Sequence, residues 1–266
     1  MRSVYIEGIG FWASRLPGWE AARAALRGEA PALAANAPRP APTLLAPTER
    51  RRAPDTVAVA LEVAAAACAN AGRDPKTMAS VFASTHGDLA ISDYMCDTLA
   101  KTPSLISPTR FHNSVHNAAA GYWTIGTGCL APYTAITAHV HTFGQGLLES
   151  ISQNAGDNMP VLYVAYDIES RGPLATMAQS RGLLGAAVVL SNELTSAAKA
   201  RLVWEVEEVP VAEPSRARAE NAALVAGNAM EDCLVFFEAL AESGNRSVAF
   251  TLGPRLELHL QIELLA

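Results

Sequence analysis

The chain has 266 residues, 50% of them hydrophobic and 17% charged, and a net charge of −6 at neutral pH. This composition fits one large or two small globular domains with a well-buried core. A negative charge without a basic stripe argues against a nucleic-acid-binding protein. Four scattered cysteines without CxxC spacing favour a reducing, cytoplasmic setting over disulfides or structural zinc. No apolar run approaches the ~18 residues that a membrane span needs.

The first part of the chain predicts a strand, a short helix, a connection and a long helix. Residues 3–12 alternate like a strand and carry an acid, which is untypical of a signal peptide. Residues 19–27 have the pattern of a short amphipathic helix. The proline-rich stretch 29–54 predicts a surface connection. The Ala- and Val-rich stretch 56–71 then predicts a helix that is buried on most of its faces.

Further strands and helices alternate up to about residue 190. Residues 79–84 predict a core strand, followed by the polar loop 85–88, where ligands of α/β proteins usually bind. His86 in this loop is either a site residue or an ordinary loop histidine. A helix over 89–100 and apolar strands over 160–167 and 185–191 predict a layered α/β unit around a largely parallel sheet.

The last part of the chain has a different pattern. Residues 201–209 predict a half-exposed strand, 218–242 one long helix, and 247–252 and 256–264 two further strands. The predicted division is therefore 1–195 and 196–266, the second part being a β-α-β-β piece of the same compact unit.

The central stretch, 107–149, has the pattern of a catalytic strand-turn-helix. An extended entry and a small-residue helix over 114–124 precede a glycine-rich turn, an apolar strand over 133–138 and a second helix from about residue 142. Many α/β enzymes hold their nucleophile at a sharp turn between such a strand and helix. The residue at this turn is His139, and neither serine nor cysteine stands there.

Other chemistry near the turn finds little support in the sequence. Cys129 lies about ten residues before the turn and is expected to be a small buried or interface thiol. His139 and His141, with His112 and His116 upstream, have spacings that could converge on one ion. No carboxylate or cysteine stands among them, so neither a metal nor a cofactor is predicted. Catalysis through His139 as nucleophile or base stays an alternative.

Three sequence blocks carry a resemblance to a known family. They are SPTRFHNSVHNAAAGYW (107–123), VFAS followed by GD (81–88), and VLYVAYD followed by GPLA (161–167 and 172–175). Together with Thr137-Ala138-His139, they resemble the β-ketoacyl synthases of the thiolase superfamily, in which the corresponding strand ends Thr-Ala-Cys. The resemblance is greatest to the short chain length factor subunits of aryl polyene-type gene clusters.

The resemblance implies a thiolase-like layered α/β fold with an N-terminal ketosynthase half and a reduced C-terminal half. His139 would occupy the position of the family's nucleophilic cysteine. The family's second half supplies two catalytic polar side chains. Here it contains only His259, which the alternation of its strand directs to solvent or a partner. No catalytic residue is therefore predicted, and the chain is not expected to be catalytic alone.

The implied function is that of a chain-length-factor-like subunit in fatty acid or polyketide elongation. It would form a heterodimer with an active β-ketoacyl synthase and shape its acyl tunnel, with an acyl carrier protein as further partner. The candidate tunnel or interface residues are Phe111, His112, Val115, His116, Ala118, Tyr122, Trp123, Thr137 and His141. Ordinary core packing or helix capping competes with this interpretation. The alternatives are a small autonomous acyltransferase or condensing enzyme that uses His139, and a scaffold that binds acyl carrier protein.

Overall fold

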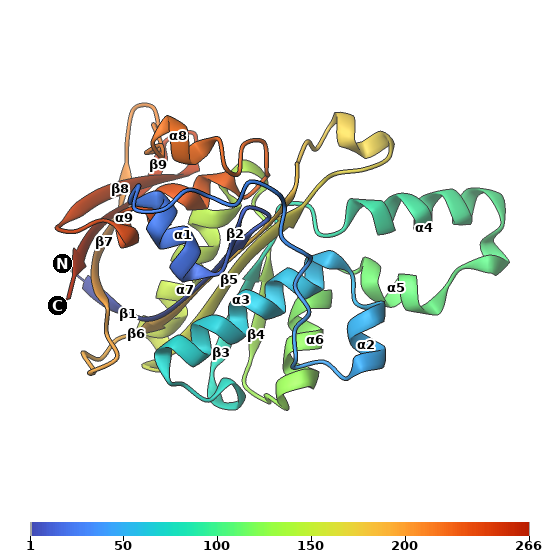
Figure 1. Cartoon of the computed structure of the whole chain (residues 1–266), viewed down its shortest axis with the longest axis horizontal. Coiled ribbons are helices and arrows are strands. Elements are labelled where there is room, and N and C mark those ends of the chain that lie inside the picture. Colours follow the sequence, from blue (N-terminus) through green and yellow to red (C-terminus); the bar gives the residue numbers. More distant parts are fainter. Residues whose placement is uncertain (1, 266) are drawn as a thin grey trace.

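The computed structural model describes residues 2–265, and one nine-stranded sheet runs through them (Figure 1). The strand order is β4-β3-β5-β6-β1-β7-β9-β8, with β2 paired to β1. The strands are β1 (Arg2–Ala13), β2 (Leu16–Pro17), β3 (Ala79–Ala83), β4 (Tyr133–Ile136), β5 (Val161–Ile168), β6 (Leu183–Ser191), β7 (Ala200–Glu208), β8 (Arg246–Gly253) and β9 (Leu256–Leu264). All of the long predicted strands are therefore present.

The prediction of a largely parallel sheet is wrong. Among the described strands, only β3 pairs in parallel, with β4 on one side and β5 on the other. β6 runs antiparallel to both β5 and β1, and β7, β8 and β9 continue the antiparallel pattern. Apolar runs such as that of β6 are equally typical of parallel strands and of antiparallel strands covered on both faces, so their composition does not reveal direction.

Helices cover both faces of the sheet and produce two separate cores. One core holds α1 (Trp19–Leu26), α7 (Thr142–Asp157) and α9 (Leu234–Ala241) against the sheet. The opposite core holds α3 (Asp55–Ala71) and α6 (Ala118–Thr127). Burial of these apolar faces is the main source of stability. The remaining helices are α2 (Pro47–Arg52), α4 (Leu89–Lys101), α5 (Pro108–Ser114) and α8 (Ala219–Ala222).

The buried helix α3 lies unusually close to the sheet because small residues line its path. A Cβ on Gly8 of β1 would come within 2.0 Å of the Ala67 carbonyl oxygen. A Cβ on Gly10 would come within 2.1 Å of the Val63 carbonyl oxygen. Glycine is therefore required at both positions for the backbones to approach this closely.

Two predicted helices are interrupted in the structure. The helix expected over 114–124 is replaced by α5 and α6, with Val115 between them in an extended conformation. The prediction of one long helix over 218–242 is wrong as well, because only α8 and α9 form at the two ends of this segment. Between them Gly227 adopts φ 80°, and the Asn228 side chain bonds to the Arg181 carbonyl 2.8 Å away. Asparagine side chains compete with helical hydrogen bonding in this way.

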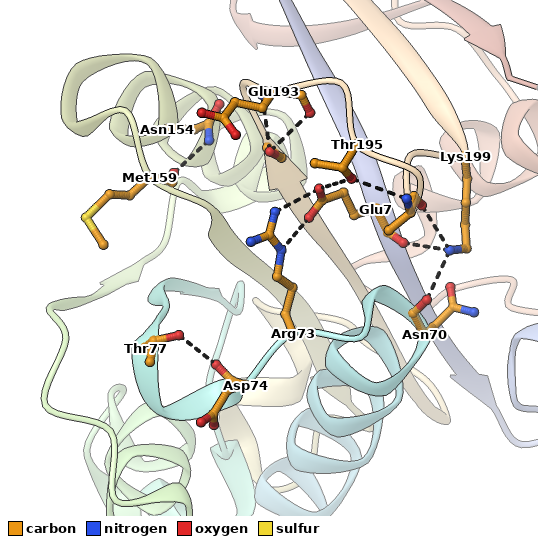
Figure 2. A network of polar contacts seen from close by, with 12 residues as sticks. Glu7, Asn70, Arg73, Asp74, Thr77, Asn154, Met159, Glu193, Thr195 and Lys199 are labelled. Carbon is orange, nitrogen blue, oxygen red and sulfur yellow. Dashed lines mark hydrogen bonds and ion pairs between the residues drawn. The ribbon is translucent and has the colours of Figure 1, made fainter.

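A buried polar network joins the first strand to residues near the start of β7 (Figure 2). Glu7 is fully buried at a bulge in β1, and its carboxylate accepts bonds of 2.7 and 2.8 Å from the Arg73 guanidinium. The Thr195 hydroxyl donates a third bond of 2.6 Å to this carboxylate. The Lys199 ammonium donates to the carbonyls of Glu7 and Asn70 at 2.7 and 3.0 Å. The network thus links segments almost 190 residues apart.

Helices α4 and α5 reach away from the sheet on one side of the molecule (Figure 1). Within residues 2–265, no helix combines the length and the apolar character that crossing a membrane requires.

Candidate functional site

The strand-turn-helix predicted around residue 139 is present. Strand β4 ends at Ile136, a 3-10 turn spans His139–His141, and α7 begins at Thr142. His139 has φ 53°, and Asn158 is the only other non-glycine residue of positive φ within residues 2–265. Such a backbone conformation is costly for a residue with a side chain, and it is typical of functional turns.

Thr142, the first residue of α7, holds this turn in place. Its hydroxyl donates a 2.7 Å bond to the His139 carbonyl and accepts a 3.0 Å bond from the Ala138 amide. The His141 amide closes the turn through a 3.0 Å bond to the Ala138 carbonyl. The turn is therefore built by the backbone and Thr142, without the ring of His139.

The two histidines of the turn point to different surroundings. His139 is exposed, and its ring makes no hydrogen bond within residues 2–265. Nδ1 of His141 lies 2.9 Å from the Thr251 hydroxyl on β8. No group of three or more histidine, cysteine or acidic side chains in the described part of the chain could hold a metal ion.

The loop after β3 connects the turn to the rest of the site. The Asp167 carboxylate, at the end of β5, accepts bonds from the Ser84 hydroxyl at 2.8 Å and the Thr85 amide at 2.9 Å. Nε2 of His116 donates to the Ser84 carbonyl at 2.8 Å. The Thr137 hydroxyl donates to the Thr85 carbonyl at 3.0 Å. His116 and Thr137, two of the predicted site residues, thus have structural partners in this loop.

Two acids with raised pKa values, the buried Asp167 and the half-buried Asp232, were not identified as site residues from the sequence. Burial raises the pKa of Asp167, although the donors of the loop oppose this effect. Burial and the neighbouring charges of Glu231 and Asp167 raise the pKa of Asp232 to about 7. Asp232 was missed because it lies in the segment predicted as one helix. Asp167 ends a recognised sequence block and could have been singled out there.

The four thiols are distributed away from residue 139. Cys68, Cys129 and Cys233 are buried, and Cys96 is exposed on α4. Burial raises the pKa of Cys68 to about 12 and that of Cys233 well above its ordinary value. Cys129 lies on the turn before β4, where its Sγ contacts the Met78 carbonyl at 3.5 Å. Burial therefore disfavours the thiolate, which is the reactive form, at Cys68 and Cys233.

The aromatic and aliphatic candidates divide into exposed and buried groups. Phe111 and Val115 are 59% and 45% exposed. Tyr122 is half-buried, with its ring centroid 5.5 Å from that of His112 in an edge-on arrangement. Trp123 is buried and packs 6.5 Å from Phe82 in the core with α3. Ordinary core packing therefore describes Trp123.

The turn lies at the open edge of the sheet. Strand β4 pairs only with β3, so its other edge has no partner strand within residues 2–265. Tyr133 on this edge accepts a 3.0 Å bond from the Asn117 amide group. Large apolar side chains next to the edge are exposed, including Leu130 at 98% and Val140 at 64%. An exposed apolar surface beside an unpaired strand is typical of an interaction site.

His259 takes no part in this site. It lies on β9 beside the carboxylates of Glu257 and Glu207, with Nε2 2.8 and 3.8 Å from their oxygens. It was predicted to face solvent or a partner, and its side chain is 37% exposed.

Comparison with known proteins identifies the family to which the chain is similar. The family model described as "Beta-ketoacyl synthase, N-terminal domain" matches residues 23–250. No curated protein matches the chain.

Solved ketosynthase structures share the fold across nearly the whole chain. One is the ketosynthase ApeO in complex with its chain length factor ApeC from Xenorhabdus doucetiae, with a TM-score of 0.71 at 18% identity over 98% of this chain and 99% of that one. The ishigamide ketosynthase/chain length factor gives 0.72 at 16% identity over 99% and 100%. The complex AntDE:AntF, a type II polyketide ketosynthase with its acyl carrier protein, gives 0.74 at 10% identity over 100% of both chains.

These structures confirm the predicted thiolase-like layered α/β fold, which they share across nearly the whole chain. Since the family model matches residues 23–250 of the 266, the chain belongs to the β-ketoacyl synthase family.

Proposed function

We propose that this chain is a non-catalytic, chain-length-factor-like subunit of a β-ketoacyl synthase. The observation that carries the proposal is the intact strand-turn-helix with His139 at its strained position. A condensing enzyme needs a thiolate there to hold the acyl chain. The three buried thiols have other positions, and burial raises the pKa of Cys68 and Cys233.

The partner would be an active β-ketoacyl synthase that supplies the cysteine and receives chains from an acyl carrier protein. The unpaired edge of β4 and the exposed apolar residues beside it support association through this side of the sheet. Two of the similar solved structures are named as a ketosynthase together with a chain length factor. Fatty acid or polyketide elongation of the aryl polyene type, in the cytoplasm, is the proposed setting.

The subunit would also set the depth of the acyl tunnel. Phe111 and Val115 project from the region of α5, and Ala118 begins α6 close by. In the assembled pair these side chains would meet the growing chain. A phenylalanine in place of Val115 or Ala118 is expected to shorten the product. Unchanged product length with an intact heterodimer would instead favour a scaffold that binds acyl carrier protein without controlling length.

Co-expression with an active β-ketoacyl synthase proposed as its partner tests the association. The two chains are expected to co-purify and to elute together on gel filtration. Val140→Glu should abolish this pairing, because it buries a charge in the proposed interface. Leu194→Glu is the matched control, since Leu194 is equally exposed at 65% but lies in the loop between β6 and β7. A chain that remains alone, or equal behaviour of the two variants, would refute the pairing.

The ring of His139 is exposed and makes no hydrogen bond to any described residue, so the alternative of an acyltransferase that uses His139 can be tested directly. The isolated chain is incubated with acyl thioesters and assayed for acyl transfer. Our proposal expects no turnover above that of the His139→Ala variant. Turnover that depends on His139 would establish an autonomous acyltransferase instead.

A further inference from the structure

A cavity of about 650 Å³ lies apart from the strand-turn-helix, at the ends of β5 and β6. Its walls come from the start of α3, the start of α4, α5 and the loop that follows β5. Three arginines, Arg52, Arg110 and Arg171, line it, and we call it the arginine cavity. Its volume is within the range of roughly 300–1,000 Å³ that is usual for small-molecule sites.

The charges around the arginine cavity are only partly balanced. Three acids also line it, but Asp55 is paired with Arg39 at 2.9 Å and Glu169 with Arg171 at 3.5 Å. Within residues 2–265, neither Arg52 nor Arg110 forms an ion pair with a carboxylate. Arg110 instead lies over the Tyr94 ring, 4.0 Å from its centroid. Two guanidinium groups are thus left to attract an anion.

The third acid, Asp88, is occupied by the protein. Its carboxylate accepts a 3.0 Å bond from the Ile91 amide and a 3.4 Å bond from the Thr56 hydroxyl. Burial raises the pKa of Asp88, and these hydrogen bonds oppose that effect. Its carboxylate is thus already bonded to donors of the protein.

The N-terminus of helix α3 borders the cavity. The helix has 17 residues, and no side chain caps its N-terminus at Pro54. Pro54 and Asp55 line the cavity. The first amides of a long helix, together with its dipole, favour an anion at this end.

The other lining residues suit an aliphatic ligand that carries hydroxyl groups. Ile91, Ile168 and Leu183 supply apolar contacts, and no aromatic ring lines the cavity. Ser107 and Thr109 supply hydroxyls. Asn113 also lines it. The residue is 5% exposed, and its buried Oδ1 has no hydrogen-bond partner within residues 2–265. The Asn113 side chain does interact with Tyr122, but a buried amide oxygen without a partner is uncommon in proteins.

From these features we propose that the arginine cavity binds a small aliphatic phosphate monoester bearing hydroxyl groups. Phosphate offers three oxygens to the two unpaired guanidinium forks, which bind oxyanions in a bidentate manner. The carbon chain lies over the isoleucines and leucine of the cavity. This binding is independent of the proposed pairing with a ketosynthase.

Titration calorimetry of the full chain with glycerol 3-phosphate, and with inorganic phosphate as the minimal probe, tests the proposal. We expect saturable binding of both, with glycerol 3-phosphate the tighter. Arg52→Gln and Arg110→Gln should each weaken it about tenfold, the effect of losing one charged hydrogen-bonding partner. Arg51→Gln is the matched control, because Arg51 is exposed on the same helix as Arg52 but does not line the cavity.

Several outcomes would overturn the proposal. One is the absence of saturable binding in the millimolar range. Another is an equal loss of affinity in the Arg51 and Arg52 variants, which would show general attraction to a basic surface. A third is tighter binding of malonate than of either phosphate, which would assign the cavity to carboxylates. Thermal melting of each variant verifies the fold, and α2 has no buried residue whose replacement would disturb it.

Discussion

Replacing Glu7 with glutamine tests whether the polar network in Figure 2 holds the chain together. The change removes the charge that the Arg73 guanidinium approaches at 2.7 and 2.8 Å and weakens the bond from Thr195. Removing one partner of a buried ion pair costs about 3–5 kcal/mol. The Arg73 side chain is 33% exposed, so water compensates part of the loss. We therefore expect Glu7→Gln to lower the free energy of unfolding by about 2–3 kcal/mol.

Urea denaturation followed by circular dichroism measures this difference. A loss of about 2–3 kcal/mol corresponds to a decrease in Tm of roughly 4–12 °C for a protein of this size. The control is Glu193→Gln, because Glu193 is an exposed acid whose charge also acts on Arg73. Its effect should stay within about 0.5 kcal/mol. A Glu7 variant as stable as this control would refute the reasoning.

The same network predicts a pH dependence. Burial alone would raise the pKa of Glu7, but hydrogen bonds from Arg73 and Thr195 outweigh it and lower the pKa below its ordinary value of 4.5. An acid whose pKa is lower in the folded state stabilises the protein at pH values above its pKa in the unfolded state. This stabilisation is lost as the pH falls through the pKa of the folded state. The stability difference between wild type and Glu7→Gln should therefore shrink below about pH 4.5. A difference that is constant down to strongly acidic pH would contradict this assignment.

Three further predictions concern the site. Gly146→Ala should destabilise by about 1–3 kcal/mol, because its Cβ would lie 2.8 Å from the Tyr163 ring and hydroxyl; thermal melting measures this. His139→Val should cost about 1–2 kcal/mol because a β-branched residue tolerates positive φ poorly, whereas His139→Gly should not destabilise the fold; urea denaturation compares them. The stability advantage of Asp232→Asn over wild type should grow as the pH rises from 3.8, the ordinary pKa of an aspartate, to about 7, and should then level off. Denaturation at several pH values over this range measures the difference.

Each of these has a control or a contradicting outcome. For Gly146 it is Gly156→Ala in the same helix, where nothing lies within 4 Å of the new Cβ and a gain of about 0.5–1 kcal/mol is expected. Equal effects at the two glycines would disprove the packing argument. Equal stability of the valine and glycine variants at residue 139 would show that the turn is unstrained. A pH-independent difference for Asp232→Asn would mean that this acid titrates normally.

Local patterns in the sequence predicted most of the elements, because strands such as β5 and helices such as α3 are long and strongly patterned. They did not predict strand direction, which depends on connections that composition does not encode. The breaks at Val115 and Gly227 were missed for a related reason. Both interrupt helix-favouring sequence, and the second is set by tertiary bonds such as that of Asn228 to Arg181.

The candidate site was predictable where one residue sits at a recognisable turn, as His139 does. It was not predictable where function depends on segments that meet only in the folded chain. Asp167 and the loop after β3 are more than 80 residues apart in sequence. The arginine cavity likewise joins residues from 52 to 171. The division at residues 195 and 196 stays a prediction, although β1 pairs directly with β7 across it.

The way Thr142 secures the tight turn has an evolutionary consequence. Because the anchoring hydroxyl belongs to the helix, position 139 can change among residues that tolerate its positive φ without loss of the surrounding architecture. A single codon change could then silence or restore a nucleophile while leaving the scaffold foldable. Inactive relatives of an enzyme could arise readily from such a design, and a cysteine reintroduced at position 139 should be accommodated by the existing backbone.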